Sequence, residues 1–183
     1  MIDWEGIVRE EGPAVWRTAQ RLLANRADAD EVFQETFAAA LQLVRRQNDP
    51  VRNWRAMLVR LATARAIDKL RQRLRRASHE IEGANVAKLP DRHLDSGPSD
   101  RAEQAELAQR LRDHLAHLPP KQADAFCLHC LEGWSHREVA EQMDESIDNV
   151  GVLVHRARAA LKQRMASILP QGKSGAESDK VSP

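Results

Sequence analysis

The chain of 183 residues contains no tyrosine, only three phenylalanines and no sustained alternation of apolar and polar residues. β-Strands favour aromatic and β-branched side chains in alternation, so these absences leave little signal for a sheet. An excess of charge of one sign is also missing, because the formal net charge is +1. Any nucleic-acid interface must therefore be local. We expect an all-α protein.

Long apolar runs and a leader sequence are lacking as well. No stretch of about 18 apolar residues occurs, which predicts no membrane span. The segment 1–5, MIDWE, has neither a basic nor an apolar signal region, so we expect a cytoplasmic protein. We find no nucleophile–base arrangement and no phosphate-binding loop in the sequence. We therefore expect no enzymatic activity and no cofactor or metal.

Cysteine is scarce, and both copies, Cys127 and Cys130, form a single Cys-x-x-Cys pair. Such a pair could be redox-active or supply half of a zinc site. Phe126, Leu128 and Leu131 place it in an apolar helical segment, where cysteine acts as a small hydrophobic residue. We favour this second interpretation and keep the metal or redox role as the alternative.

The stretch 133–161 has the pattern of two helices joined by a tight turn. Ser135 and Glu138 have the spacing of a capping box at the start of the first helix. The polar run 144–146 breaks the apolar pattern, and Ser146 or Asp148 can cap the second helix. This is the arrangement of a helix-turn-helix, whose second helix enters the DNA major groove. A helical hairpin within a bundle is the alternative.

Further helices are predicted by apolar residues that recur at helical spacing over 3–24, about 29–46 and about 51–76, and again near 101–117 and 121–131. We expect Gly12-Pro13 to interrupt the first of these and Asp28 to cap the second. Between Arg60 and Arg76 seven basic residues face one acidic residue, which leaves +6 on this segment. Such a run suits DNA phosphates, and a solvated basic helix is the alternative.

Glycine, proline and serine gather in the middle of the chain, where Pro90 and Pro98 preclude a continuous helix. We therefore predict two small helical domains, 1–76 and 102–168, joined by a flexible linker over 77–101. The polar residues 169–183 are predicted to be a disordered tail.

Three blocks of this sequence resemble one known family. The segment 26–37, RADADEVFQETF, is similar to the DAEDLVQETF signature of extracytoplasmic-function (ECF) sigma factors, a branch of the sigma-70 family. Residues 54–71 resemble that family's following promoter-reading segment, and 118–161 resemble its fourth region. The resemblance covers about 10–76 and 102–165. It implies a region 2 helical bundle, a region 4 helix-turn-helix, and a factor that directs core RNA polymerase to promoters.

The resemblance also implies the partners. Region 2 would dock on the β′ clamp helices of core RNA polymerase and region 4 on the β flap, with promoter DNA and an anti-sigma factor as further partners. The polymerase-binding residues would be Asp28, Asp30, Glu31, Gln34 and Glu35. From the local sequence alone, stabilisation of the helix dipole is the favoured explanation of these acidic residues near a helix N-terminus, and the resemblance reverses that preference.

Promoter DNA would be contacted by two sets of residues. The minus-ten set comprises Asn53, Trp54, Arg55, Arg60, Thr63, Arg65, Lys69, Arg71, Arg73, Arg75 and Arg76. The minus-thirty-five set comprises Ser146, Asp148, Asn149, Gly151, Val152, His155, Arg156 and Arg158. Trp54 could stack on a base or could be a core residue.

The chain departs from the family pattern at several positions. Ala64 stands where the family usually has Asn, and Gly151 and Leu153 stand where it usually offers Lys or Arg. The segment 135–161 carries five acidic and three basic residues, a net charge of −2. We therefore expect weak minus-thirty-five binding or apolar contacts to thymine methyl groups. Asn149 is the best candidate for a specific hydrogen bond, to adenine.

Two other functions remain open at this point. The chain could be a dimeric helix-turn-helix regulator that binds DNA without polymerase, or a protein-binding adaptor whose helix-turn-helix no longer binds DNA. The acidic block 28–35 favours the sigma factor, because a stand-alone regulator has no evident use for it.

Overall fold

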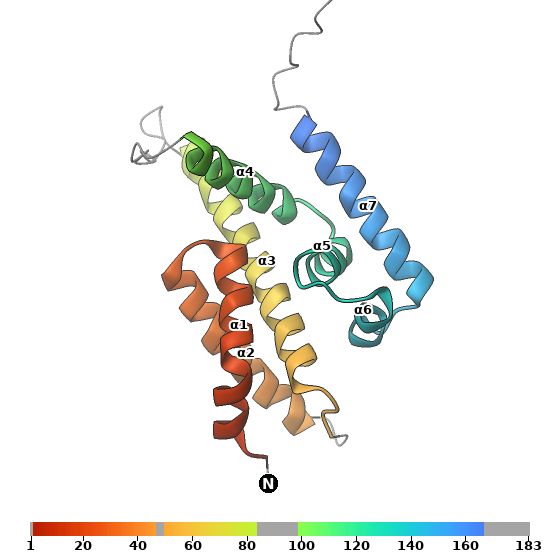
Figure 1. The fold of residues 1–183 in the computed structure, drawn as a ribbon. Coiled ribbons are helices and arrows are strands. Elements are labelled where there is room, and N and C mark those ends of the chain that lie inside the picture. Colours follow the sequence, from red (N-terminus) through yellow and green to blue (C-terminus); the bar gives the residue numbers. More distant parts are fainter. Residues whose placement is uncertain (1, 47–49, 84–98, 167–183) are drawn as a thin grey trace, which may run out of the picture.

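The computed structural model describes residues 2–46, 50–83 and 99–166, and within them the chain forms helices and no strand. The expected all-α class is therefore confirmed. The elements in chain order are α1 (Trp4–Leu23), α2 (Arg26–Arg46), α3 (Trp54–Gly83), α4 (Ser99–Ala116), α5 (Pro120–Phe126), the π-helical turn η1 (Cys127–Leu131), α6 (His136–Met143) and α7 (Ile147–Ala166) (Figure 1). The predicted tail 169–183 lies outside the described residues. No helix in the described part of the chain has the length and apolar character needed to cross a membrane.

Helix α1 is continuous, so the predicted interruption at Gly12-Pro13 is wrong. A proline inside a helix removes one backbone hydrogen bond, and its ring crowds the carbonyl group one turn earlier. Here the residues that follow it, Ala14 and Val15, are buried against the rest of the bundle, and this burial holds the helix together.

Helix α2 begins earlier than predicted, and its cap is Asn25 rather than Asp28. The side-chain oxygen of Asn25 accepts the backbone N–H of Asp28 at 3.1 Å. Asp28 therefore lies in the first helical turn, where its carboxylate can approach the neighbouring helix α3.

Helix α3 extends through Gly83, beyond the predicted end at Arg76, and α4 begins at Ser99. Both helices thus enter the segment predicted as a linker, while 84–98 lie outside the described residues. The division into two domains stays a prediction.

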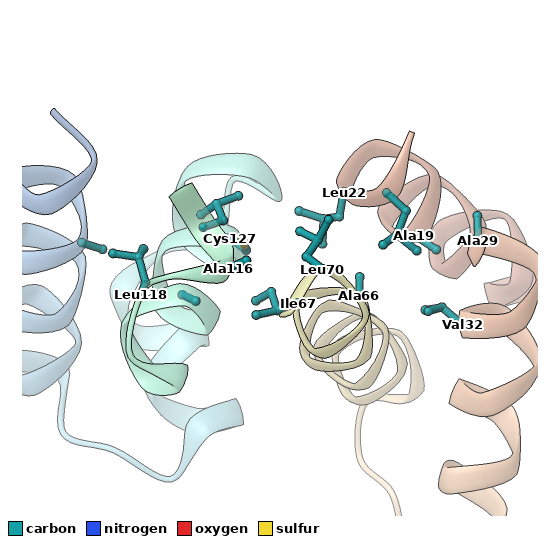
Figure 2. Close-up of a cluster of buried hydrophobic side chains, with 14 of the residues drawn as sticks. Ala19, Leu22, Ala29, Val32, Ala66, Ile67, Leu70, Ala116, Leu118 and Cys127 are labelled. Carbon is teal, nitrogen blue, oxygen red and sulfur yellow. The ribbon is translucent and has the colours of Figure 1, made fainter. Parts of the chain in front are cut away.

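The core shows that the two predicted halves pack together around α3. Figure 2 shows Ala66 of α3 on the side of Ala29 and Val32 of α2, and Ile67 on the side of α4 and α5. One buried cluster contains residues from both halves, including Ala19, Leu22, Ala29, Val32, Ala66, Ile67, Leu70, Ala116, Leu118, Cys127 and Leu161. Helix α3 is therefore covered on one side by α1 and α2 and on the other by α4 and α5.

The C-terminal helices form the predicted helix-turn-helix. Ser135 and Glu138 make the capping box, with each side chain bonded to the other residue's backbone N–H. The hydroxyl of Ser146 accepts the N–H of Asn149 at 3.1 Å and caps α7. Both predicted caps are confirmed.

Candidate polymerase and nucleic-acid interface

The acidic side of α2 lies alongside the basic side of α3. Four ion pairs join the two helices: Asp28–Arg73, Asp28–Lys69 at 3.9 Å, Glu31–Lys69, and Glu35–Arg65 at 3.3 Å. The structure thus brings together acids expected to bind polymerase and bases expected to bind DNA. In this conformation each set neutralises part of the other.

The α2 surface is nevertheless open to solvent. Asp30 and Gln34 are exposed, and no ion pair to Asp30 is found within the described residues. The side chains of Glu31 and Glu35 are 51% and 47% exposed, whereas Asp28 is 21% exposed. Asp30, Glu31, Gln34 and Glu35 can therefore be reached by a partner.

The first residues of the minus-ten set stand at the start of α3. The side-chain oxygen of Asn53 accepts the N–H of Ala56 at 2.9 Å and caps the helix. The Trp54 ring packs edge-on against Trp4 with centroids 5.3 Å apart, which makes it part of the bundle core. Arg55 and Arg60 are exposed.

Thr63, which is also predicted to contact DNA, is not accessible in this conformation. Its side chain is fully buried, and its hydroxyl donates to the carbonyl oxygen of Val59 at 2.9 Å. Thr63 follows the exposed Arg60 by three positions, but it faces the bundle interior and is a core residue here.

The basic residues farther along α3 divide into two groups. Arg71 donates to the carbonyl oxygens of Ala116 and Leu118, at 3.3 and 3.0 Å, and so joins α3 to the connection between α4 and α5. Arg73 donates to the carbonyl oxygen of Leu23 at 3.2 Å. Burial lowers the pKa of the Arg73 guanidinium. Arg75 and Arg76 are exposed and remain accessible to phosphates.

The predicted minus-thirty-five residues gather on the outer side of α7. Its inner side is buried through Val150, Leu153, Val154, Ala157 and Leu161. Exposed are Ser146, Asp148, Asn149, Val152, His155, Arg156 and Arg158, with Gly151 half-buried among them. The Val152 side chain is 43% exposed, so an apolar group is available on this face for a thymine methyl.

Sequence analysis missed the polar contacts that join the two halves. The Glu132 carboxylate accepts hydrogen bonds from the Thr18 hydroxyl at 2.8 Å and from Arg21 at 2.9 Å. Asp124 of α5 is largely buried near α3, and this burial raises its pKa to about 6 despite the nearby guanidinium groups of Arg60 and Arg71. Neither contact carries a sequence signal, because the partners lie on helices far apart in the chain.

The structure places the cysteine pair in η1, at the edge of the core. Cys127 belongs to the core cluster of Figure 2, and burial raises the pKa of its thiol well above the usual range. Cys130 is half-buried, and its sulfur accepts a hydrogen bond from Arg158 at 3.3 Å. Within the described residues no group of three or more His, Cys, Asp or Glu side chains could hold a metal ion.

Comparison with known proteins agrees with this layout. The sequence profile of Sigma-70 region 2 matches residues 7–76, and that of Sigma-70 region 4 matches 108–161. The ferric citrate uptake sigma factor FecI of Escherichia coli is 31% identical over 78% of each chain. The ECF RNA polymerase sigma factor SigE of Mycolicibacterium smegmatis is 29% identical over 91% of this chain. The chain spans 63% of the length of that relative.

Two solved structures share the fold. The sigma factor RpoE of Bartonella quintana, in complex with the anti-sigma factor NepR, has a TM-score of 0.52 at 20% identity and covers 90% of this chain and 97% of its own. CnrH, in complex with the cytosolic domain of CnrY, has a TM-score of 0.53 at 24% identity and covers 89% and 87%. The helices and their order define a two-region sigma fold. The chain belongs to the sigma-70 family of RNA polymerase sigma factors, in its extracytoplasmic-function branch.

Proposed function

We propose that the chain binds core RNA polymerase and directs it to promoters, without catalysis of its own. The observation that carries this proposal is that each of the two matched family regions contains a solvent-exposed helix face. Region 2 contains the solvent-accessible acidic face of α2, and region 4 contains α7 with its outer face free for DNA. A factor that recruits polymerase to a promoter needs both a polymerase-binding face and DNA-binding faces.

The polymerase contact is assigned to Asp30, Glu31, Gln34 and Glu35, with Asp28 as a less accessible member. Carboxylates on an exposed helix face suit a basic or polar protein surface, because complementary charges speed association and fix orientation. We assign this partner to the β′ clamp helices, as the family resemblance implies, and region 4 to the β flap.

The DNA contacts are assigned to α3 and α7. On α3 the exposed residues Asn53, Arg55, Arg60, Arg75 and Arg76 are the first available to the minus-ten region. Arg65, Lys69, Arg71 and Arg73 become available once their present partners are displaced. On α7 the outer face would enter the major groove at the minus-thirty-five element.

An anti-sigma factor is a further proposed partner. Of the two structural relatives, RpoE was solved in complex with the anti-sigma factor NepR, and CnrH in complex with the cytosolic domain of CnrY. Since core polymerase lies in the bacterial cytoplasm, we propose that the chain works there.

The test is co-purification of the full chain with bacterial core RNA polymerase. We expect the wild type to be retained and the double variant Asp30→Arg/Glu31→Arg to be lost, because the reversal places two positive charges on the proposed docking face. The control is Glu103→Arg/Glu141→Arg, which makes the same change of net charge at exposed positions of α4 and α6. This control should be retained like the wild type.

The competing function is a regulator that binds DNA without polymerase. If the wild type is not retained by core polymerase yet shifts duplex DNA on its own, the regulator replaces the sigma factor. Loss of the control variant along with the docking variant would also count against the α2 face.

A further inference from the structure

The turn between α6 and α7 carries an acidic side chain that contacts the best candidate for base recognition. Glu145 lies just before α7, and its Oε2 accepts a hydrogen bond from the Asn149 side-chain amide at 2.6 Å. Its other oxygen, Oε1, pairs with Lys121 of α5. The Glu145 side chain is only 13% exposed. An acidic residue is unexpected beside a DNA-reading helix, because its charge would repel phosphates.

The position of this carboxylate is fixed from three directions. The Glu145 backbone N–H donates to the carbonyl oxygen of Ala140 at 3.1 Å, which closes the turn after α6. Lys121 holds one carboxylate oxygen from α5, and Asn149 occupies the other. These hydrogen bonds also lower the pKa of Glu145, with the Lys121 bond the larger cause and the Asn149 bond next. The carboxylate therefore stays ionised as an acceptor.

The hydrogen bond determines which atoms of Asn149 remain for DNA. An asparagine amide has two N–H donors and one carbonyl acceptor. Glu145 takes one donor and thereby fixes which end of the amide is nitrogen. One N–H and the carbonyl oxygen remain, and these are the donor and acceptor that bind adenine N7 and N6 in a bidentate contact. Without this bond the exposed amide could rotate and present its two ends in either order.

We propose that Glu145 is a positioning residue that orients the Asn149 amide for reading an adenine in the minus-thirty-five region, while Lys121 neutralises its charge. This rests on the proposed promoter-binding function. The proposal explains why an acidic residue stands in this turn. The Glu145 carboxylate orients Asn149, and Lys121 neutralises the charge that would otherwise repel phosphates.

The test uses holoenzyme reconstituted from bacterial core RNA polymerase and the full chain. A promoter library randomised in the minus-thirty-five region is selected for binding, and the base preferences are read by sequencing. Asn149→Ala first identifies the position that Asn149 reads. At that position we expect Glu145→Ala to lower the preference for adenine by about tenfold. In Glu145→Ala/Asn149→Ala we expect no further loss beyond Asn149→Ala.

Two variants separate positioning from charge. Glu145→Gln removes the charge but keeps an oxygen that can accept from Asn149, so the adenine preference should be retained. Lys121→Ala leaves the Glu145 charge unmasked, and it should weaken binding to all sequences without changing the preferred base. Thermal melting of each free variant checks that the helix-turn-helix remains folded.

A matched control lies on α6, where Glu141 pairs with Arg137 at 3.1 Å and both side chains are exposed. Glu141→Ala also removes one acidic residue from region 4, and it should leave every base preference unchanged.

The proposal would be overturned if Glu145→Ala left the adenine preference unchanged. It would also be overturned if the adenine preference became stronger in Glu145→Ala, because the carboxylate would then withhold Asn149 from DNA. A third contradicting result is that no base preference depends on Asn149. If the wild-type holoenzyme selects no sequence at all, the proposed function fails together with it.

Discussion

At the scale of single residues, Asp124 is the clearest case of an interaction that tertiary packing creates. Its carboxyl group is largely buried near α3, and this burial raises its pKa to about 6 from 3.8. Between these values the folded chain holds a proton that the unfolded chain has lost. The stabilising effect of this proton is complete below about pH 4 and disappears as the pH rises through 6.

Asp124→Asn should therefore stabilise the chain at pH 7 and have little effect near pH 4. The gain at pH 7 is expected to be roughly 3 kcal/mol, because the two pKa values differ by about two units and each unit corresponds to about 1.4 kcal/mol. Urea unfolding of wild type and variant across this pH range measures the difference. Exposed Glu103→Gln controls for the change of charge alone. A stability difference that does not vary with pH would show that the Asp124 carboxyl has the same pKa in the folded and unfolded chain, which would contradict this account.

Residue roles were predictable where the cause is local. The caps at Ser135 and Ser146 follow from side-chain hydrogen bonds within one turn, and the structure confirms both. The burial of Thr63 could not be predicted, because a resemblance of sequence does not show which way a helical residue faces. The engagement of Arg71 with the connection between α4 and α5 depends on how the two halves pack, which no local pattern reports.

At the scale of elements, two glycines of the helix-turn-helix region differ in whether the backbone conformation requires glycine. Gly133 has φ +78°, and a Cβ there would meet no atom within 4 Å, so only the backbone conformation requires glycine. Gly151 is inside α7, where a Cβ would make an ordinary contact with His136 at 3.9 Å.

Gly133→Ala should destabilise the chain by about 1 to 2 kcal/mol, because an L-residue is strained in the left-handed region. Gly151→Ala should stabilise it by about 0.5 to 1 kcal/mol, because glycine is a poor residue inside a helix. Urea unfolding measures both changes, and each variant controls for the other. Equal effects of the two substitutions would contradict the assigned conformations.

The helices were largely predictable from apolar spacing, and their ends were not. Pro13 was expected to break α1, yet the helix continues because its neighbours are buried on both sides. The extension of α3 to Gly83 enters the segment 77–101, whose glycine, proline and serine content predicts a linker. The π-helical turn η1 has no sequence signature either. It is closed by a hydrogen bond from the Glu132 N–H to the Cys127 carbonyl oxygen at 3.0 Å. Glu132 also contacts α1, because its carboxylate accepts a hydrogen bond from the Thr18 hydroxyl.

At the scale of the whole molecule, the closed packing of the two halves sets a geometric requirement. The names of the two promoter elements place them about 25 base pairs apart, or about 85 Å along B-DNA. A compact chain of 183 residues has a radius of gyration of about 16 Å. Regions 2 and 4 cannot reach both elements in the arrangement of Figure 1. The proposed function therefore requires the two regions to separate when the chain binds polymerase and promoter.

This separation can be measured with spin labels at Gln42→Cys on α2 and Gln163→Cys on α7, both exposed, in a Cys130→Ser background that leaves only buried Cys127. The free chain should give one narrow distance distribution. The complex with core polymerase and promoter DNA should give a distance longer by at least about 20 Å, as the spacing of the elements demands. An unchanged distance in the complex would contradict the separation of regions 2 and 4.

The most direct test of the central claim is transcription by bacterial core RNA polymerase with this chain added as the only initiation factor. With genomic DNA of the source bacterium as template, we predict discrete transcript starts that require the chain and share sequence elements upstream. These starts should disappear with Asp30→Arg/Glu31→Arg and persist with Glu103→Arg/Glu141→Arg. If no transcript depends on the chain, while the chain alone binds duplex DNA, then it is a regulator and not a sigma factor.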